Sequence, residues 1–487
     1  MLTVTRVLSS TCLLLLTGSA RLFAQGAAQP LVNGTVVTGQ CQGHQSQPGC
    51  VLPNLFGSTG LTLFNSPAFS HYAHFIGSAQ TTLNETVSTA IATQLTTLPI
   101  ISPASGFTYR YDSASGAFVR TTTSLGPVYT ERAETIGRRN FSFGVSYQRF
   151  RFQNLDGIDL HKIPAVFSHV PGTGPGGAAE PYEADVISTV NNIDLKMDQT
   201  VLYGTVGITD RLDVSVAVPI VSVRMAATSN ATIFRVSGPT FVPGPGLPAV
   251  GNPHEFNAGG ALTNIYTGNG SASGIGDVTF RVKGTVFSNE NVGVALAVDV
   301  RTPTGSADQF LGSGATGIRP FIAISGRHRF SPHLNLGYEW NGESILAGNI
   351  TGTTVGEDAA GSPTILNGPA VKRKLPAQLT YAVGADAGVT RALTLSFDYL
   401  GQALFDAPRA FLSSTITQNI AGGTGPLTLP TITGGRDTIG LSNGAVGVKY
   451  NLAGKLLLIG DILFRLDHKG LRQDVTPLIA LSYEFGH

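Results

Sequence analysis

Residues 275–301 read IGDVTFRVKGTVFSNENVGVALAVDVR, a stretch in which apolar and polar positions alternate along both halves. The two apolar files are Val278, Phe280, Val282, Gly284 and Val286, and then Val292, Val294, Leu296, Val298 and Val300. The polar turn Ser288–Asn291 separates them, so the pattern predicts a β-hairpin. At roughly 3.3 Å per residue and a tilt of about 40°, each run rises on the order of 23 Å, close to the ~25 Å apolar band of an outer-membrane barrel.

The same alternation recurs from residue 139 to the end of the chain. It predicts about twelve strands, an even count that suits a closed antiparallel barrel. The expected strands are 139–152, 193–203, 212–220, 278–286, 292–300, 319–329, 334–340, 379–389, 393–399, 446–450, 456–465 and 476–485. In the first strand the apolar file shifts to Phe150 and Phe152, which predicts a β-bulge near Gln148. In the second, Ile193, Leu195 and Met197 alternate with Asp194, Lys196 and Asp198.

The connections between these strands alternate in length. Those after even-numbered strands have roughly three to eight residues, whereas the others have roughly fifteen to sixty and include a predicted loop at 225–273. Short periplasmic turns and long outer loops are the asymmetry expected of a bacterial barrel. Both barrel ends are therefore expected on the periplasmic side.

The start of the chain resembles a secretory signal peptide over residues 1–24, with Arg6 followed by an apolar core at 7–17 and cleavage expected after Ala24 or, as the alternative, after Ala28. We expect no transmembrane helix, because no later stretch has eighteen consecutive apolar residues. A secreted chain of long alternating strands spans a membrane only as a closed barrel, which predicts a location in the outer membrane of a Gram-negative-type bacterium. The 31 basic and 30 acidic residues give a net charge of +1, which provides no electrostatic case for binding nucleic acid or an anionic membrane surface.

Residues 25–130 lack barrel-length alternation. Thr82–Glu85 fits a capping box, and Leu83, Val87 and Ile91 follow at helical spacing, so a helix is expected before Pro99. A short hairpin is expected at 107–121. The segment is either a small periplasmic extension or a plug folded into the lumen, and the barrel itself is assigned to residues 131–487.

Three cysteines are present. Cys12 lies in the signal segment, whereas Cys41 and Cys50 are close together in a chain bound for an oxidising compartment, which predicts a disulfide between them. A metal site at these two residues and His44 is the alternative.

Charged residues recur on one file of the predicted strands. A Lys or Arg that faces lipid at the membrane centre costs roughly 2–4 kcal/mol, so this file is expected to line an aqueous interior. Its mixed signs imply paired charges rather than an ion-selective ring. The candidate pore-lining residues are Asp277, Arg281, Lys283, Asp299, Arg301, Arg319, Arg327, Glu339, Asp386, Asp398, Lys449, Asp461, Arg465 and Glu484.

Four stretches carry a family resemblance: Gly207–Pro219, Gly274–Val278, Arg301–Gly305 and Asn335–Tyr338. Together they resemble outer-membrane proteins of the meta-pathway of phenol degradation over roughly residues 190–485. The resemblance implies a barrel that passes aromatic or other hydrophobic compounds, and it assigns no substrate-binding residue. The chain is more distantly similar to long-chain fatty-acid and aromatic-hydrocarbon channels, whose N-terminal hatch is suggested here by Asn65–Ala68.

Patterns that would indicate enzymatic chemistry are isolated. The G-x-G-x-x-G stretches at 172–177 and 312–317 lie in expected loops and not between a strand and a helix. His71 and His74 have no acidic partner nearby in the sequence. Among the histidines, His328 is the one expected within a strand, on the lipid side near a turn. We therefore expect no enzyme activity, no cofactor and no metal site.

The sequence thus predicts an outer-membrane channel for small hydrophobic or aromatic solutes. The alternative is a structural or surface-interaction barrel whose outer loops bind a partner, and an outer-membrane hydrolase is the least favoured class. The expected partners are outer-membrane lipid and, through Tyr483 and Phe485 of the last strand, the barrel assembly machinery.

Overall fold

The computed structural model describes much of the chain after residue 40. The described residues are 41, 44–56, 61–64, 75, 78–98, 101–102, 109–112, 117–120, 124–169, 181–236, 240–241, 250–349, 353–357, 363–367, 370–419 and 426–485. The predicted signal peptide, Cys12, Asn65–Ala68, His71 and His74 lie outside them.

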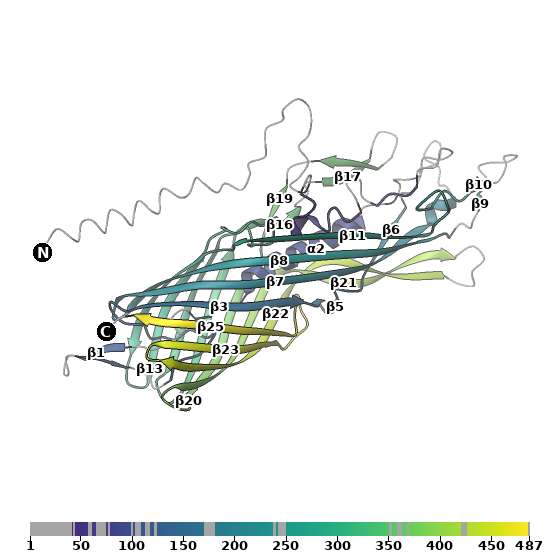
Figure 1. Ribbon diagram of the computed structural model, residues 1–487. Coiled ribbons are helices and arrows are strands. Elements are labelled where there is room, and N and C mark those ends of the chain that lie inside the picture. The colour runs from purple at the N-terminus through teal and green to yellow at the C-terminus, as the bar shows by residue number, and fades with distance from the viewer. Residues whose placement is uncertain are drawn as a thin grey trace, which may run out of the picture.

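Twelve antiparallel strands form a closed barrel (Figure 1). Each strand pairs with the next one along the chain, and β25 closes the circle by pairing with β3, with Phe485 opposite Phe141. The predicted class and strand count are therefore confirmed. The strands are β3 (Phe141–Phe152), β7 (Val186–Thr209), β8 (Leu212–Phe234), β12 (Thr279–Ser288), β13 (Val292–Arg301), β14 (Gly317–Gly326), β15 (Phe330–Asn341), β20 (Ala377–Gly388), β21 (Leu393–Asn419), β22 (Pro426–Ala453), β23 (Leu456–Arg465) and β25 (Val475–Phe485).

The remaining elements decorate or fill this barrel. They are η1 (Pro48–Cys50), α2 (Ser78–Thr97), β1 (Tyr109–Asp112), β2 (Ala117–Arg120), β4 (Asn154–Leu155), β5 (Ile158–Asp159), β6 (Ile163–Ser168), η3 (Pro181–Ala184), β9 (Thr240–Phe241), β10 (Val250–Gly251), β11 (Thr263–Ile275), β16 (Glu343–Asn349), β17 (Thr353–Glu357), β18 (Pro363–Asn367), β19 (Val371–Lys374) and β24 (Leu471–Arg472). None of the described helices is long and apolar enough to span a membrane.

Short turns join the strands at one end of the barrel, and Phe141 and Phe485 lie at the same end (Figure 1). This end is periplasmic by the usual asymmetry of bacterial barrels. At the other end the prediction of a loop over 225–273 was wrong. There β8 continues to Phe234, and β11 pairs with it from Thr263–Thr232 to Ile275–Ile220. The extension is built mainly of Thr, Asn, Ser and Gly, so it lacks the apolar period that reveals a strand in the sequence.

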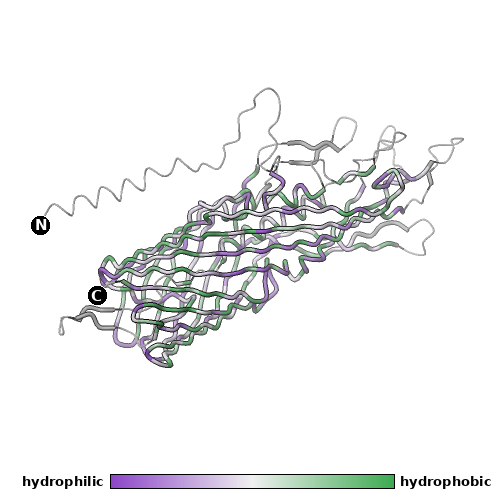
Figure 2. The backbone as a smooth tube through the Cα atoms, in the orientation of Figure 1, coloured by the Kyte–Doolittle hydropathy of each residue, from purple (hydrophilic) through white to green (hydrophobic). Residues whose placement is uncertain are grey.

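The outer surface of the barrel is apolar over the membrane-spanning length. Phe280, Leu296 and Ile462 are each about half exposed to the surroundings of the isolated chain. Aromatic residues mark both borders of this band. Phe141, Phe143, Phe330, Tyr483 and Phe485 lie toward the periplasmic end, and Tyr338, Trp340 and Phe405 lie toward the outer end. A closed barrel with this surface is an outer-membrane barrel. Figure 2 shows the alternation of apolar and polar residues along the strands.

Two details of the predicted strands were wrong. Strand β3 pairs with β7 without interruption from Phe141–Val206 to Phe152–Leu195, so no bulge occurs at Gln148. Phe150 and Phe152 point inward instead, as do Ile193, Leu195 and Met197 of β7, and the alternating Asp194, Lys196 and Asp198 lie on the outer face. The reason is that the outer half of the lumen is filled by the N-terminal segment, so its wall is apolar on the inside.

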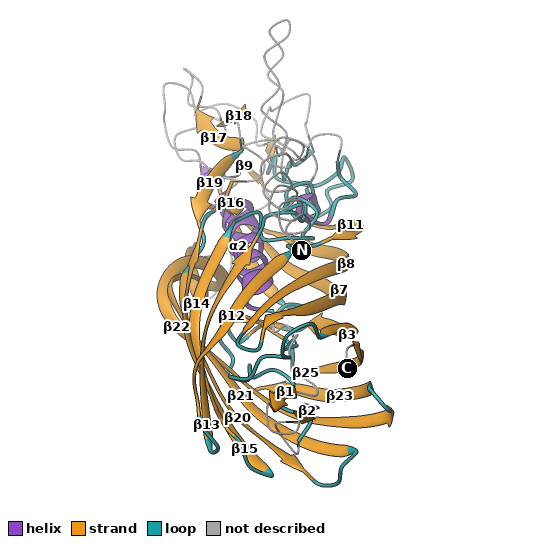
Figure 3. Ribbon diagram, turned by 90° about the vertical axis from the view of Figure 1, so that its left-hand side faces the viewer, coloured by secondary structure: helices purple, strands orange, loops and turns teal. Residues whose placement is uncertain are grey.

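Helix α2 occupies this outer half of the lumen (Figure 3). Leu83, Val87 and Ile91 are buried in a core that also contains Phe150 and Met197 of the wall. Residues 78–98 thus correspond to the plug alternative. The helix begins at Ser78, four residues before the predicted cap at Thr82. The predicted hairpin is present as β1 and β2, at the periplasmic end (Figure 1).

Cys41 and Cys50 are joined by a disulfide, with their Cα atoms 5.1 Å apart. The closed loop packs against the extended wall above the membrane. The N–H of Gly49 donates to the carbonyl of Asp308 at 3.0 Å, and that of Ser271 donates to Ser46 at 3.1 Å. These two bonds hold the described part of the disulfide loop against the barrel.

The assignment of faces can be tested on β13. Leu296→Arg places a cation on the lipid side near the membrane centre and should lower the free energy of unfolding by about 2–4 kcal/mol, whereas Val292→Arg at the periplasmic border should cost about 0–1 kcal/mol. Urea titration of the refolded protein in lipid measures both. Equal losses in the two variants would contradict this arrangement.

Candidate functional site

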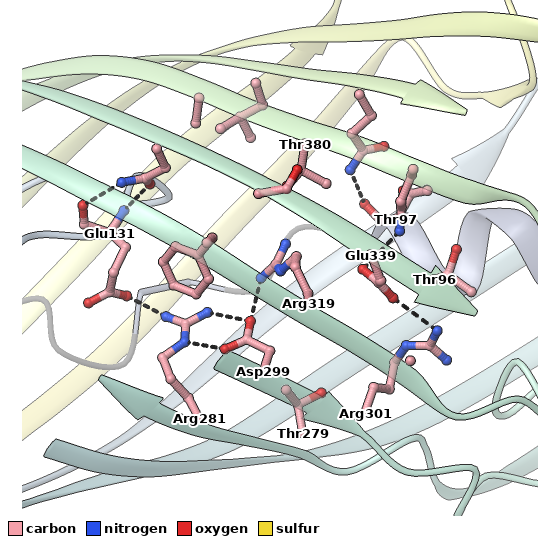
Figure 4. A pocket seen from close by; sticks show the side chains of 18 of the residues that line it. Thr96, Thr97, Glu131, Thr279, Arg281, Asp299, Arg301, Arg319, Glu339 and Thr380 are labelled. Carbon is pink, nitrogen blue, oxygen red and sulfur yellow. Dashed lines mark hydrogen bonds and ion pairs between the residues drawn. The ribbon is translucent and has the colours of Figure 1, made fainter. Parts of the chain in front are cut away.

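A cavity of about 160 Å³ lies in the lumen between the last turn of α2 and the segment 124–137 (Figure 4). Thr96, Thr97 and Leu98 border it on the side of α2, and Tyr129 and Glu131 border it on the side of the segment. Its remaining wall comes from inward-facing residues of β8, β12, β13, β14, β15, β20 and β21. The cavity therefore sits between two obstructions contributed by the N-terminal part of the chain.

All fourteen candidate pore-lining residues are buried or half-buried in the structure. Five of them line the cavity, namely Arg281, Asp299, Arg301, Arg319 and Glu339. Others hold the segment 124–137, and the remainder lie elsewhere along the inner wall. The sequence did not indicate that so few of these charges would meet an open space, because the path of the N-terminal segment is not encoded in strand alternation.

A cross-strand row of charges forms one wall of the cavity. Arg281 of β12, Asp299 of β13 and Arg319 of β14 are direct neighbours in the sheet register. Nε and Nη2 of Arg281 donate to Asp299 at 2.6 and 2.9 Å, and Arg319 donates to the same carboxylate at 2.5 Å (Figure 4). Opposite charges that face each other across neighbouring strands stabilise the pairing of those strands. An arginine that donates two hydrogen bonds to one carboxylate forms a particularly strong ion pair.

Two further groups complete this row. Arg281 also forms an ion pair with Glu131 of the segment 124–137, so the row is tied to the plug. The ring of Phe321 lies 5.0 Å from the guanidinium carbon of Arg281 and 5.5 Å from that of Arg319, within cation–π range. Every charge in the row therefore has a partner of opposite sign or an aromatic face.

A second network lies on the outer side of the cavity. Arg301 donates to Asp277 at 3.2 Å and to Glu339 at 3.1 Å, and the second oxygen of Glu339 accepts from Gln378 at 2.9 Å. Arg301 also donates to the carbonyl of Ala315 at 2.9 Å. These contacts fix the connection between β13 and β14 against the inner wall. Both networks hold charges in pairs, as expected from their mixed signs.

The segment 124–137 has no regular secondary structure of its own, yet it is almost completely buried. Buried backbone groups need hydrogen-bond partners, and the wall supplies them from polar side chains. The N–H groups of Glu131, Ala133 and Ile136 donate to Asn335 at 2.6 Å, Ser325 at 3.0 Å and Asp213 at 2.9 Å, respectively.

Two buried lysines hold the same segment through its carbonyls. Lys283 donates to the carboxylate of Glu131 at 2.7 Å and to the carbonyls of Glu134 at 2.7 Å and Arg132 at 3.2 Å. Lys449 donates to the carbonyl of Pro127 at 2.5 Å. Two of the predicted lumen cations thus serve as anchors for the plug.

Ser325, His333 and Asp386 form a hydrogen-bonded chain on the inner wall. The imidazole contacts Ser325 at 2.9 Å through Nδ1 and pairs with Asp386 through Nε2. The expectation for histidines was therefore wrong: the turn contains His328, and His333 lies inside β15. The hydroxyl of Ser325 is fully buried and accepts the N–H of Ala133. This constellation joins the plug to the wall and presents no open nucleophile.

Of the two glycine-rich stretches, one lies in the described part of the chain and the other does not. Residues 172–177 lie outside the described part of the chain. Residues 312–317 connect β13 to β14, where Ser313 donates its backbone N–H to Asp277 at 2.8 Å. This stretch is a loop between two strands, as the sequence predicted, and it is folded against the wall.

Several cavity residues were missed by reasoning from sequence. Tyr129 and Glu131 lie outside any strand, and Phe321 was not singled out because it is an aromatic residue on a mostly polar file. One sequence feature could have indicated a role for this segment. Two acidic residues, Glu131 and Glu134, lie shortly before the first barrel strand in a stretch that otherwise resembles a linker.

The fold and the lumen define the class of protein: an outer-membrane β-barrel with an internal plug and a lumen cavity lined by paired charges. The family described as MetA-pathway of phenol degradation matches residues 172–360. The family resemblance seen in the sequence is thereby confirmed for this part of the chain, which is less than half of it. No curated protein matches the sequence.

Solved structures with a similar architecture are outer-membrane barrels. An outer membrane channel from Pseudomonas putida F1 has 12% identity, covers 72% of this chain and 98% of its own, and gives a TM-score of 0.41. A Pseudomonas aeruginosa FadL homologue has 10% identity, coverages of 79% and 96%, and a TM-score of 0.31. The P. putida toluene transporter TodX has 10% identity, coverages of 72% and 90%, and a TM-score of 0.29.

Replacement of Lys283 tests the anchoring of the plug. Lys283→Met leaves the buried carboxylate of Glu131 without one of its cations, and breaking a buried pair in this way costs about 3–5 kcal/mol. We expect amide hydrogen exchange in 124–137 to accelerate by at least about tenfold, since this cost far exceeds the 1.4 kcal/mol that corresponds to a factor of ten.

The double variant E131Q/K283M is the control for this experiment. It removes both charges, so it should regain part of the lost protection, and a double-mutant cycle gives the coupling between the two residues. Unchanged exchange in K283M would show that the lysine does not hold the segment.

Proposed function

We propose that this protein is an outer-membrane channel for small hydrophobic or aromatic solutes and that the lumen cavity binds them transiently as they pass through the barrel. The observation that carries the proposal is a cavity with paired charges, held inside a membrane-spanning barrel between two plug elements. A purely structural barrel has no need for a defined space at this position.

The size of the cavity favours a solute with one ring. A cavity of about 150 Å³ in another protein accommodates benzene, and the space here is about 160 Å³. Tyr129, Phe321 and Leu400 provide apolar contact, and Thr279 presents its hydroxyl to a polar substituent (Figure 4). A monocyclic compound with one hydroxyl matches this combination.

The electrostatics favour a neutral solute. The carboxylate of Asp299 is paired with two arginines, and Arg301 is paired with two carboxylates. An ion entering the cavity would meet no unpaired charge of opposite sign in this part of the wall and would lose its hydration. A neutral compound avoids both costs.

The segment 124–137 is the element whose displacement would connect the cavity to the periplasm. Helix α2 belongs to a large apolar core, so moving it would expose apolar surface at roughly 25 cal/mol per Å². The segment 124–137 is held chiefly by hydrogen bonds and ion pairs to the wall, which water can replace one at a time. We therefore assign the gate to this segment.

Transport is also favoured over hydrolysis by the state of the serine–histidine–aspartate chain. Ser325 is covered by Ala133 of the gate, and its hydroxyl is already engaged as an acceptor. A hydrolase would need this oxygen to face a substrate. The arrangement supports a role of these residues in holding the gate.

A disulfide across the gate tests this mechanism. A Cβ built on Gly293 of β13 lies 3.1 Å from the Cβ of Ala133, a few tenths of an ångström short of the roughly 3.5–4.5 Å found in disulfides. Oxidised A133C/G293C should lose at least about tenfold in uptake of a radiolabelled monocyclic phenol by intact cells, and reduction should restore it.

Controls separate locking from other effects of oxidation. The single variants A133C and G293C should transport normally in either redox state. The unaltered protein with reductant reveals any contribution of the Cys41–Cys50 disulfide. Uptake by the locked protein equal to that of the single variants would refute the gate, and no uptake above cells lacking the protein would refute the channel and favour a surface-interaction barrel.

The cavity itself is tested at Thr380, whose side chain faces the space (Figure 4). Thr380→Trp should fill much of the cavity and reduce uptake of the monocyclic phenol several-fold. Thr380→Val has nearly the same shape and is the matched control, with near-normal uptake expected. Equal transport by both variants would place the path of the solute elsewhere.

A further inference from the structure

Strands β3, β7 and β8 lie side by side in the barrel wall (Figure 1). Three cations form a row across their outer face. Arg151 lies directly opposite Lys196, and Lys196 lies directly opposite Arg224. All three residues belong to the outward-facing register, and both arginines are exposed. Like charges that face each other across neighbouring strands destabilise the pairing unless an anion lies between them.

The row lies at a defined height above the apolar band. On β8 the outward-facing residues Leu212–Ile220 are apolar, and Ser222 and Arg224 follow them. Arg224 is twelve residues beyond Leu212, which corresponds to about 40 Å along the strand and about 30 Å along the barrel axis. With an apolar band of ~25 Å, this position falls at the headgroup level of the outer leaflet.

Nearby acidic residues compensate only part of this charge. Arg149 pairs with Asp198 at 3.2 Å, and Lys196 pairs with Asp194 at 2.5 Å. Tyr147 donates its hydroxyl to Asp198 at 2.6 Å. Arg151 and Arg224 have no ion pair within the described residues, so two guanidinium groups in the row are uncompensated.

We infer that this row binds the phosphate groups of the phosphorylated glycolipid that forms the outer leaflet, lipid A. Arg151 and Arg224 are two strands apart, about 10 Å at the backbone, and their long side chains can converge on one phosphate group or hold two. Arginine is suited to phosphate because its planar fork of donors matches the phosphate oxygens. An anion in the row also removes the repulsion between the three cations.

The surroundings of the row fit a sugar-bearing headgroup. Asn192 of β7, Ser222 of β8, and Ser271 and Ser273 of β11 lie on the same outer face, and Ser271 is directly opposite Arg224. Their side chains offer hydrogen bonds to hydroxyl groups. Below them, Tyr147 and Ile220 begin the apolar band that contacts the acyl chains. The net charge of +1 gave no hint of this site, because it averages the row with acidic residues elsewhere.

Titration of lipid A into the detergent-solubilised full chain tests the inference, with native mass spectrometry as the readout. We expect the unaltered protein to bind diphosphoryl lipid A at least about tenfold more tightly than the same lipid without phosphates. R151Q/R224Q should lose at least about tenfold in affinity for the diphosphoryl form. Equal binding of the two lipids, or unchanged affinity in R151Q/R224Q, would overturn the assignment.

R211Q/R391Q is the matched control, because it removes two exposed arginines from periplasmic turns and makes the same change in net charge. It should bind lipid A as the unaltered protein does, and a similar loss in both double variants would reduce the effect to general electrostatics and overturn the site. Millimolar inorganic phosphate should not displace the lipid, and displacement would show a free-phosphate site instead.

Heat-modifiable mobility on gels verifies folding of each variant. If R151Q/R224Q does not fold, the single variants R151Q and R224Q carry the test, each with an expected loss of at least about threefold. Lipid binding is measured independently of solute uptake, so a negative result for the lipid site would not refute the proposed channel, and the converse also holds.

Discussion

The structure depends on one constraint: a backbone N–H or C=O group that is removed from water needs a hydrogen-bond partner inside the protein. In the membrane, closure of β25 onto β3 satisfies this requirement for the wall. In the lumen, the irregular segment 124–137 meets it through wall side chains such as Asn335, Ser325 and Lys283. The polar side chains of the inner face are therefore needed to bond the backbone of the plug, in addition to any role in the passage of solute.

The same constraint divides the lumen into two chemical halves. Toward the outside, the wall is apolar on its inner face, because α2 satisfies its own backbone and presents Leu83, Val87 and Ile91 for burial. Toward the periplasm, the plug is the irregular segment 124–137, and the wall presents charges and amides. The cavity lies at the junction of the two halves, where neither kind of packing is complete.

Much of the barrel could be predicted from sequence where its outer face meets lipid. The hairpin of β12 and β13 was evident because lipid on one side and polar groups on the other impose a strict period of two. On β7 the assignment of the apolar face to lipid was wrong, because Ile193 and Leu195 face inward. The outer part of β8 was not recognised as a strand, because both of its faces meet water or protein. Alternation shows that a strand has two different faces, but it does not show which face is lipid.

The sequence by itself determined the class: a barrel of twelve strands, a disulfide between Cys41 and Cys50, and one set of charged positions kept away from lipid. Only the tertiary structure decided what those charges meet. Lys283 and Lys449 hold a plug, and Arg281 and Asp299 border a cavity. Arg151 and Arg224, which are not among the predicted inward-facing charges, face outward at the membrane border. The physical reason is that local alternation fixes the side of a strand, whereas the partner of each side chain is set by contacts between residues far apart in the chain.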